Sequence, residues 1–223
     1  MSDSDAAPEF FVVDGDSHTP HDFGDDDALA VPFVAVTPDG LAQKTVFGFT
    51  TKQGLESFLV AAGYARDFHA VETLLQRAAA AVAAESYDED TVRTLQSLEA
   101  ADAIPRYYRS LGRHGASSEQ VANLIADYNP LLGAPVHSAL LFRLPKYHGV
   151  PCPLGGGGAV YPDLGYFNFD NVTTSIAVST LTVLYDAKGC PPTGKQVWVT
   201  THIPDLRVWP YKFNNLASSA IVL

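Results

Sequence analysis

The feature that most constrains the fold of this chain is an internal repeat in its last third. Pro162-Asp163-Leu164 is followed by the polar stretch Asp170-Asn171-Val172-Thr173-Thr174-Ser175. Pro204-Asp205-Leu206 is followed in the same way by Asn214-Asn215-Leu216-Ala217-Ser218-Ser219. The two polar stretches begin 44 residues apart, and a period of this size indicates one structural unit used twice. Each copy ends in a polar loop that leads into a strand.

The residues around the repeat predict an all-β region. Short runs rich in β-branched and aromatic residues are separated by turn-forming residues, and no helical period is present. The runs are 139–143, 175–184, 196–200 and 219–223, and the turns are 155–158, 186–194 and 214–215. Several short strands separated in this way are typical of a sandwich or barrel.

At these residues the chain resembles the βγ-crystallin family. Each Greek key of the family's microbial members carries two Asn or Asp residues, two variable residues, a Ser or Thr, and then a Ser. Both polar stretches match that pattern. The resemblance covers about residues 139–223 and implies a C-terminal all-β double Greek-key sandwich.

The family also has a folded-hairpin signature, which this chain matches once. In the first copy the signature residues are Phe142, Tyr147 and Gly149. In the second copy Tyr185 is present, but Cys190 and Pro192 replace the second aromatic residue and the glycine. We therefore expect an irregular second hairpin. The serines that close the two stretches, Ser175 and Ser219, tie down these hairpins in the family.

The resemblance implies a calcium-binding domain that holds about two ions. Calcium takes six to eight oxygen ligands in flexible geometry. In the family the two stretches are exchanged across the domain, so that each site takes a hydroxyl from one and amide, carboxylate or carbonyl oxygens from the other. Val172 and Leu216 can offer only backbone carbonyls. The expected metal ligands are Asp170, Asn171, Val172, Thr174, Asn214, Asn215, Leu216 and Ser218.

The charge of this ligand set predicts a modest affinity. Asp170 is its only carboxylate, and residues 139–223 contain no glutamate. We expect a dissociation constant of about 10–100 μM, with Mg²⁺ a poor competitor because it demands octahedral geometry and dehydrates reluctantly. A Greek-key domain with the same loops and no metal is the alternative, since Asn, Asp, Ser and Thr are good turn formers.

The rest of the chain predicts a different kind of unit, so the expected fold class is multidomain α+β. Residues 1–28 form an acidic flexible tail, and residues 29–134 an α-rich domain of unknown role. This domain begins with a β-hairpin, residues 30–36 and 44–49 around a turn at 37–40. Helices follow over 51–129, where apolar residues recur at helical spacing. A Pro/Gly-rich break at 129–135 separates this unit from the β-rich region.

Charge and hydropathy exclude two classes of partner. The net charge is -11, which argues against nucleic acid, whose phosphates require Lys and Arg. The charge is uneven. Residues 139–223 hold six Lys and Arg and four carboxylates, whereas residues 1–138 hold eight Lys and Arg and 21 carboxylates. No apolar run reaches the roughly 18 residues of a membrane span. Residues 1–8 show no signal peptide, which makes the cytoplasm the default compartment and leaves the location unknown.

Other reactive residues favour no specific chemistry. Cys152 and Cys190 either pair in an oxidising compartment or remain reduced thiols. His18, His21 and the neighbouring aspartates could bind a metal, although incidental side chains are the better interpretation. The basic cluster at 106–114 could bind an anion or an acidic partner, or be a solvated helix face.

The function predicted from these observations is a non-enzymatic calcium-binding protein of a stress or structural type, in which calcium stabilises the fold by mass action. The alternative is an interaction module, an inhibitor or toxin-like effector on a crystallin scaffold, whose N-terminal unit docks an unidentified protein partner. The chain has no phosphate loop, Gly-x-Ser-x-Gly or His-Glu-x-x-His sequence, and its histidines stand alone, so no enzyme is expected.

Overall fold

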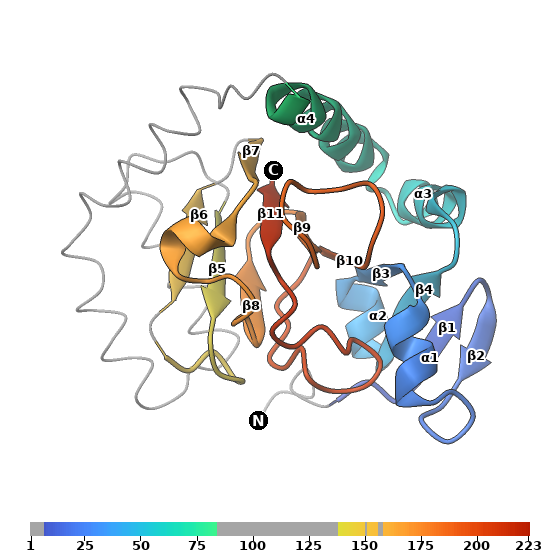
Figure 1. Cartoon of the computed structure of the whole chain (residues 1–223). Helices are drawn as coiled ribbons and strands as arrows, with labels where there is room; N and C mark the ends of the chain where they lie inside the picture. The colour runs from blue at the N-terminus through green and yellow to red at the C-terminus, as the bar shows by residue number, and fades with distance from the viewer. Residues whose placement is uncertain (1–6, 84–137, 150, 156–157) are drawn as a thin grey trace.

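The computed structural model describes residues 7–83, 138–149, 151–155 and 158–223, which form a β-sandwich with helices packed against it (Figure 1). The larger sheet is mixed and has eight strands in the order β2-β1-β4-β3-β10-β9-β11-β7. Its strands are β1 (Phe10–Val13), β2 (Asp16–His18), β3 (Phe33–Val36), β4 (Thr45–Phe49), β7 (Ala159–Tyr161), β9 (Thr182–Tyr185), β10 (Gln196–Val199) and β11 (Ser219–Val222).

The second sheet has three strands in the order β6-β5-β8. They are β5 (Ser138–Phe142), β6 (Cys152–Gly155) and β8 (Ser175–Val178). The helices are α1 (Asp25–Ala30), α2 (Pro38–Ala42), α3 (Lys52–Ala61), α4 (Ala65–Ala83) and the 3₁₀ turn η2 (Leu164–Phe167). No described helix is long and apolar enough to cross a membrane.

The two sheets exchange segments. Strand β7 belongs to the eight-stranded sheet, although β6 and β8, its neighbours in sequence, belong to the three-stranded one. In the other direction, Ile203 follows β10 and bridges to Ile176 in β8. Each copy of the repeat therefore contributes backbone to both sheets, which brings the two polar stretches close together.

The central strands of the large sheet, β3, β10, β9 and β11, are buried on both faces. Along β10, Val197 and Val199 pack into the core shared with the three-stranded sheet, whereas Trp198 between them points to the opposite core. Leu184 in β9 and Ile221 in β11 likewise face opposite sides. This period of two is the signature of a strand, and burial of both sets explains why these strands are apolar at nearly every position.

Helices α3 and α4 form the second layer over the large sheet. Leu55 and Leu59 of α3 and Phe68 of α4 are buried in the same cluster as Trp198. The rings of Phe68 and Trp198 stack with their centroids 5.4 Å apart. A face of the large sheet that would otherwise meet solvent is thus covered by the chain itself.

The large sheet also joins the first part of the chain to the repeat. Strand β3 pairs in parallel with β10, with Val34 opposite Val197. Thr200 extends the contact by donating from Oγ1 to the carbonyl of Val36 at 3.0 Å. The predicted division at residues 129–135 lies outside the described residues and stays a prediction, but one sheet contains strands from both sides of it.

The segment expected to be a flexible tail differs from that prediction. Residues 10–30 form β1, β2 and α1. Phe11 is fully buried, with ring centroids 5.5 Å from Phe23 and 6.0 Å from Trp209. Strand β1 pairs in parallel with β4, a contact that composition alone does not reveal. Two polar contacts add to this packing: Trp209 Nε1 donates to Phe23 O at 3.0 Å, and Lys212 lies 2.8 Å from Asp25.

The remaining predicted helices and strands agree with the structure in part. The predicted hairpin is present as the antiparallel pair β3 and β4. Its connection is the short helix α2, not a turn, because Pro38 stands in the first turn and Thr37 accepts from Gly40 N at 3.2 Å as the N-cap. The expected strand 175–184 is two strands, β8 and β9, and β6, β7 and η2 were not predicted. The helices expected beyond residue 83, and the basic cluster, lie outside the described residues.

Replacing Phe68 with Ala tests the docking of α4. Because Phe68 is 3% exposed and stacked on Trp198, we expect the free energy of unfolding in urea to fall by about 3–5 kcal/mol. Phe10→Ala is the matched control, since Phe10 is 39% exposed. Equal losses in the two variants would contradict the described packing.

Lys195 gives the fold a pH dependence. It is 5% exposed, donates from Nζ to the carbonyl of Ala28 at 2.8 Å, and burial lowers its pKa to about 8. Between that value and its ordinary pKa of 10.5 the unfolded chain binds more protons than the folded one, so stability rises with pH. From pH 7 to 9.5 this group alone adds on the order of 2 kcal/mol.

The measurement is urea unfolding at both pH values for the wild-type chain and Lys195→Met. The variant should lack the rise of the wild type, since other titrating groups are common to both chains. Parallel pH curves would show that the buried amine keeps an ordinary pKa.

Candidate functional site

The two polar stretches, residues 170–175 and 214–219, adopt the same conformation. Asn171 and Asn215 both have left-handed backbones, with φ of 55° and 53°. Asparagine tolerates this region better than most residues, which explains its use here. The burial of the two loops also runs in parallel, from exposed asparagines to fully buried Ser175 and Ser219. The sequence repeat is therefore a structural repeat.

The loops hold each other through exchanged backbone hydrogen bonds. Asn171 N donates to Ala217 O at 2.9 Å, and Asn215 N donates to Thr173 O at 3.1 Å. A second exchanged pair lies beside them: Leu164 N donates to Ser218 O at 2.9 Å and Leu206 N to Thr174 O at 2.7 Å. Neither loop satisfies its backbone groups alone, so each forms only against the other.

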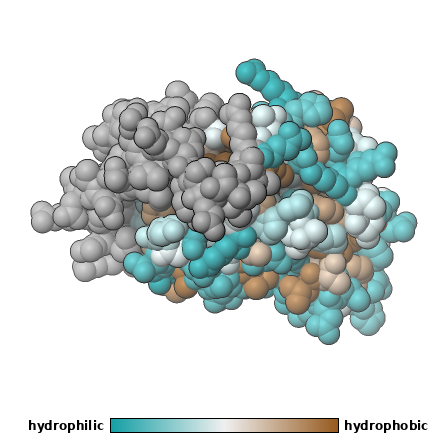
Figure 2. All heavy atoms as spheres, turned by 45° about the horizontal axis from the view of Figure 1, so that its top comes forward, coloured by the Kyte–Doolittle hydropathy of each residue, from teal (hydrophilic) through white to brown (hydrophobic). Residues whose placement is uncertain are grey.

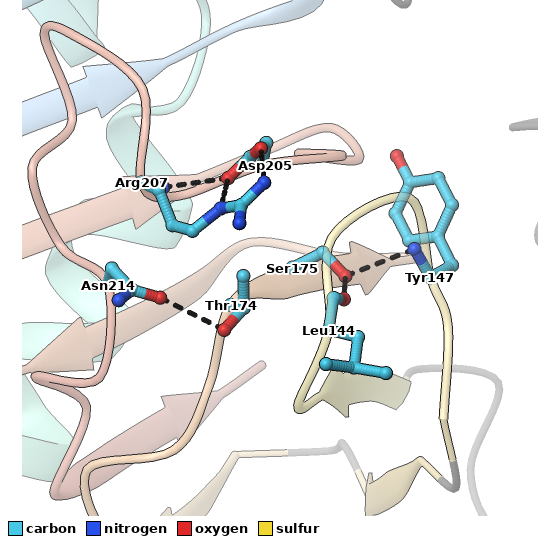
Figure 3. Close-up of polar contacts among 7 residues, drawn as sticks. All are labelled: Leu144, Tyr147, Thr174, Ser175, Asp205, Arg207 and Asn214. Atoms are coloured by element: carbon cyan, nitrogen blue, oxygen red, sulfur yellow. Dashed lines mark hydrogen bonds and ion pairs between the residues drawn. The ribbon is translucent and has the colours of Figure 1, made fainter.

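The side chains cross in the same way. Thr174 Oγ1 donates to Asn214 Oδ1 at 3.0 Å (Figure 3). Ser218 Oγ lies 3.2 Å from the side-chain amide of Asn171. Both hydroxyls are nearly buried, and each contacts an asparagine of the opposite loop. This is the exchange that the resemblance implied.

The Asn171 amide lies where several oxygens converge. With its oxygen toward Ser218, it accepts one hydroxyl hydrogen bond. With its nitrogen there, its two N–H groups have three acceptors within reach: Leu216 O at 3.3 Å, Asn215 O at 3.2 Å and Ser218 Oγ at 3.2 Å. The second orientation is the better one because both N–H groups then have acceptors. Carbonyl and hydroxyl oxygens gathered around one polar group are the kind of ligands that calcium takes.

The folded hairpins are tied to the loops by the closing serines. Ser175 Oγ accepts from Tyr147 N at 3.1 Å and donates to Leu144 O at 2.7 Å (Figure 3). Ser219 Oγ accepts from Cys190 N at 3.0 Å and donates to Ala187 O. The second hairpin is therefore tied in the same manner as the first, because Ser219 binds the backbone of Cys190 and does not require an aromatic side chain.

The hairpin tips reach the opposite copy of the repeat. Lys146 N in the first hairpin donates to Pro204 O at 2.6 Å, and Gly189 N in the second donates to Pro162 O at 2.7 Å. The aspartates that follow these prolines also turn the chain in the same way. Asp163 accepts from Gly165 N at 2.7 Å, and Asp205 accepts from Arg207 N at 2.9 Å.

The charges near the two loops are not equivalent. Asp205 forms an ion pair with Arg207, with 2.7 Å between Oδ2 and Nη2, and this partner lowers the pKa of its carboxyl against the effect of burial. Asp163 lies 2.9 Å and Asp170 3.6 Å from Lys188 Nζ. Hydrogen bonding to Asp163 raises the pKa of Lys188. Sequence reasoning missed Lys188, although its place next to Gly189 in the second hairpin was a usable signal.

The structure brings the eight expected ligand residues into two adjoining loops. Val172 and Leu216 turn their side chains toward the core between the sheets, so that only their backbone carbonyls can act as oxygen ligands. Asp170 is the exception, since its carboxylate faces Lys188. Within the described residues, no three His, Cys, Asp or Glu side chains gather as a metal-binding group.

The other candidate groups have structural contacts. His18 packs 4.7 Å from the ring of Phe23. His202 Nδ1 accepts from Val178 N at 3.1 Å, and burial lowers the pKa of this imidazole. Cys152 and Cys190 are free thiols in different core clusters, and burial raises the pKa of each to about 12. Thiols held protonated in this way are poor nucleophiles.

Comparison with known proteins gives a limited result. No protein-family model matches the chain, and none of the curated proteins matches it. Among solved structures, a βγ-crystallin from Ciona intestinalis is 22% identical, with 37% of this chain and 95% of that chain covered and a TM-score of 0.33. A βγ-crystallin from an archaeon is 15% identical, with 39% and 98% covered and a TM-score of 0.34. One from Clostridium beijerinckii is 20% identical, with 38% and 95% covered and a TM-score of 0.32. TM-scores this low carry no argument, and the conclusions below depend on the loops themselves.

Removing the Ser175 hydroxyl tests the hairpin tie. In Ser175→Ala the buried amide of Tyr147 and the carbonyl of Leu144 lose their partner, so the free energy of unfolding should fall by about 1–3 kcal/mol. Thermal unfolding would measure this, with the exposed Ser17→Ala as control. If both variants unfold at the wild-type temperature, the hydroxyl does not hold the hairpin.

Proposed function

We propose that residues 139–223 form a double Greek-key domain of the βγ-crystallin type that binds about two calcium ions in its exchanged loops and catalyses no reaction. The observation that carries this proposal is the reciprocal contact of the loops: Thr174 with Asn214, and Ser218 with Asn171. A hydroxyl from one loop and an amide from the other meet at each crossing. A cation bound there would draw ligands from both copies at once.

The chemistry of the loops supports calcium over other metals. Calcium prefers oxygen ligands and tolerates irregular geometry, whereas zinc prefers Cys and His. The residues that would hold calcium are Thr174, Ser218, Asn171, Asn214 and the backbone carbonyls at Val172, Asn215 and Leu216, with Asp170 as the one carboxylate. The ion would cross-link two loops that are far apart in sequence.

Calcium would then act on stability. Only the folded chain brings the loops together, so bound calcium favours the folded state by mass action. For the expected affinity, one site at millimolar calcium contributes about 1.5–3 kcal/mol. This supports a role in a protein that must persist, such as a stress or structural protein.

The alternative is an interaction module whose N-terminal part binds a protein partner. It would be favoured by a continuous exposed apolar patch. The exposed large hydrophobic residues of the described chain come instead from separate elements: Phe10, Leu29, Val60, Leu144 and Tyr166. The face in Figure 2 likewise shows hydrophobic residues in separate groups among hydrophilic ones. Calcium binding is therefore the better supported function.

Isothermal calorimetry of the wild-type chain and of Thr174→Ala/Ser218→Ala tests the proposal. We expect about two sites with dissociation constants of about 10–100 μM in the wild type, and loss of binding in the double variant. The matched control is Thr73→Ala/Ser57→Ala, which removes the same groups from exposed helix positions. Asn214→Ala, at a half-exposed position, serves if the double variant does not fold.

A wild-type chain that gives no binding heat and no rise in Tm at millimolar calcium would contradict the proposal. Equal responses to Mg²⁺ and Ca²⁺ would contradict the assignment of the metal, because the irregular oxygen set does not suit magnesium.

A further inference from the structure

The Asp170 loop departs from its counterpart at one point, although the two copies of the repeat match elsewhere. Asn214, the first residue of the second polar stretch, accepts a hydrogen bond from Thr174 in the opposite loop. Asp170 holds the same position in the first stretch, but its carboxylate lies 3.6 Å from Lys188 Nζ. Ser218, the counterpart of Thr174, contacts Asn171 instead. The only carboxylate of the ligand set is therefore directed to an ammonium group.

The backbone holds Lys188 in this place. Its neighbour Gly189 donates to Pro162 O at 2.7 Å, and the preceding Ala187 accepts from Ser219 Oγ. The tip of the second hairpin is thus fixed against the segment that carries Asp163. From there the Lys188 side chain, which is 55% exposed, reaches Asp163 at 2.9 Å as well as Asp170.

The first hairpin has no lysine at the equivalent position, and its Lys146 acts instead on Asp205, whose pKa it helps to lower. Its tip carries Pro145 before Lys146, whereas the second carries Lys188 before Gly189, and Lys146 and Gly189 make equivalent contacts with Pro204 and Pro162. The loop with two nearby carboxylates thus has an added cation, and the loop with Asn214 has a proline at the matching position. The two candidate sites differ in charge even though their backbones match.

We infer that Lys188 is a built-in competitor of calcium, whose ammonium group neutralises Asp163 and Asp170 and lowers the calcium affinity of the site that uses Asp170. The inference rests on the proposed function and adds a residue that sets the affinity of that site. Calcium must displace the ammonium from Asp170 or bind beside a positive charge. Either way, part of the attraction between the ion and its only carboxylate is lost, because ligand charge tunes calcium affinity.

The pair also explains how the first loop can keep its shape without metal. Asp163 and Asp170 carry like charges in one small region, and such charges repel when uncompensated. Lys188 supplies the compensating charge from the chain itself. The ion pair therefore adds a compensating charge to a loop that the exchanged backbone hydrogen bonds already hold.

Calorimetric calcium titration of the full chain with Lys188→Gln tests the inference. The variant should bind calcium about three- to tenfold more tightly at one site, while the other site is unchanged. Lys188→Arg keeps the charge and should stay within about twofold of the wild type. Lys44→Gln is the control for net charge, because it removes a lysine paired with Glu9 away from the loops.

The outcomes separate this inference from the proposed function. If Lys188→Gln binds calcium at two sites of unchanged affinity, the ion pair is only structural, whether or not the Tm falls in calcium-free buffer. This result would overturn the inference, while the proposed function would stand. Tighter binding in Lys44→Gln as well would overturn it too, since the effect would be one of net charge. Calcium binding by Lys188→Gln but not by the wild-type chain would support the inference and contradict the proposed function of the native protein. Binding by neither the variant nor the wild type would overturn both claims.

Discussion

The reciprocal hydrogen bonding of residues 170–175 and 214–219 is the constraint on which the rest of the repeat depends. Each loop completes the backbone bonds of the other, as in the pair Asn171 N to Ala217 O and Asn215 N to Thr173 O. Each closing serine then ties one hairpin, and each hairpin tip binds the opposite copy. The two loops therefore depend on each other, because a change in one removes hydrogen-bond partners from the other. A metal bound there would act on both copies together.

The rest of the described chain packs against the same β region. The central strands of the eight-stranded sheet contact the three-stranded sheet on one side and helices α3 and α4 on the other. Strand β3 continues the sheet beyond β10, and α1 is linked to the second copy through Lys195 and Lys212. The first part of the chain and the repeat thus share two hydrophobic cores. A partner that approached the outer sheet face would meet these helices first.

The sequence was most informative where a short pattern determines a local structure. The polar character of the two stretches predicted loops, and their pairing was implied by the resemblance of both stretches to the βγ-crystallin pattern. The contacts that join distant segments were not predicted. Strand β1 was assigned to a tail because its partner β4 lies far along the chain, and parallel pairing leaves no local signal. Lys188 was missed because its carboxylate partners belong to the other copy. The second hairpin was expected to be irregular, but the tie from Ser219 to the backbone of Cys190 does not depend on the side chain.

A crystal structure of the full chain grown with calcium, with anomalous difference density to locate the ion, tests the central claim most directly. Our account predicts about two peaks of density between the two loops, one beside Thr174 and one beside Ser218. Each ion should take oxygen ligands from the backbone of the opposite stretch at about 2.3–2.6 Å. The Asn171 amide would turn to present its oxygen, since its nitrogen cannot be a ligand beside the metal. Density elsewhere, or loops unchanged and free of metal at millimolar calcium, would contradict the account and leave a β-sandwich whose loops only hold each other.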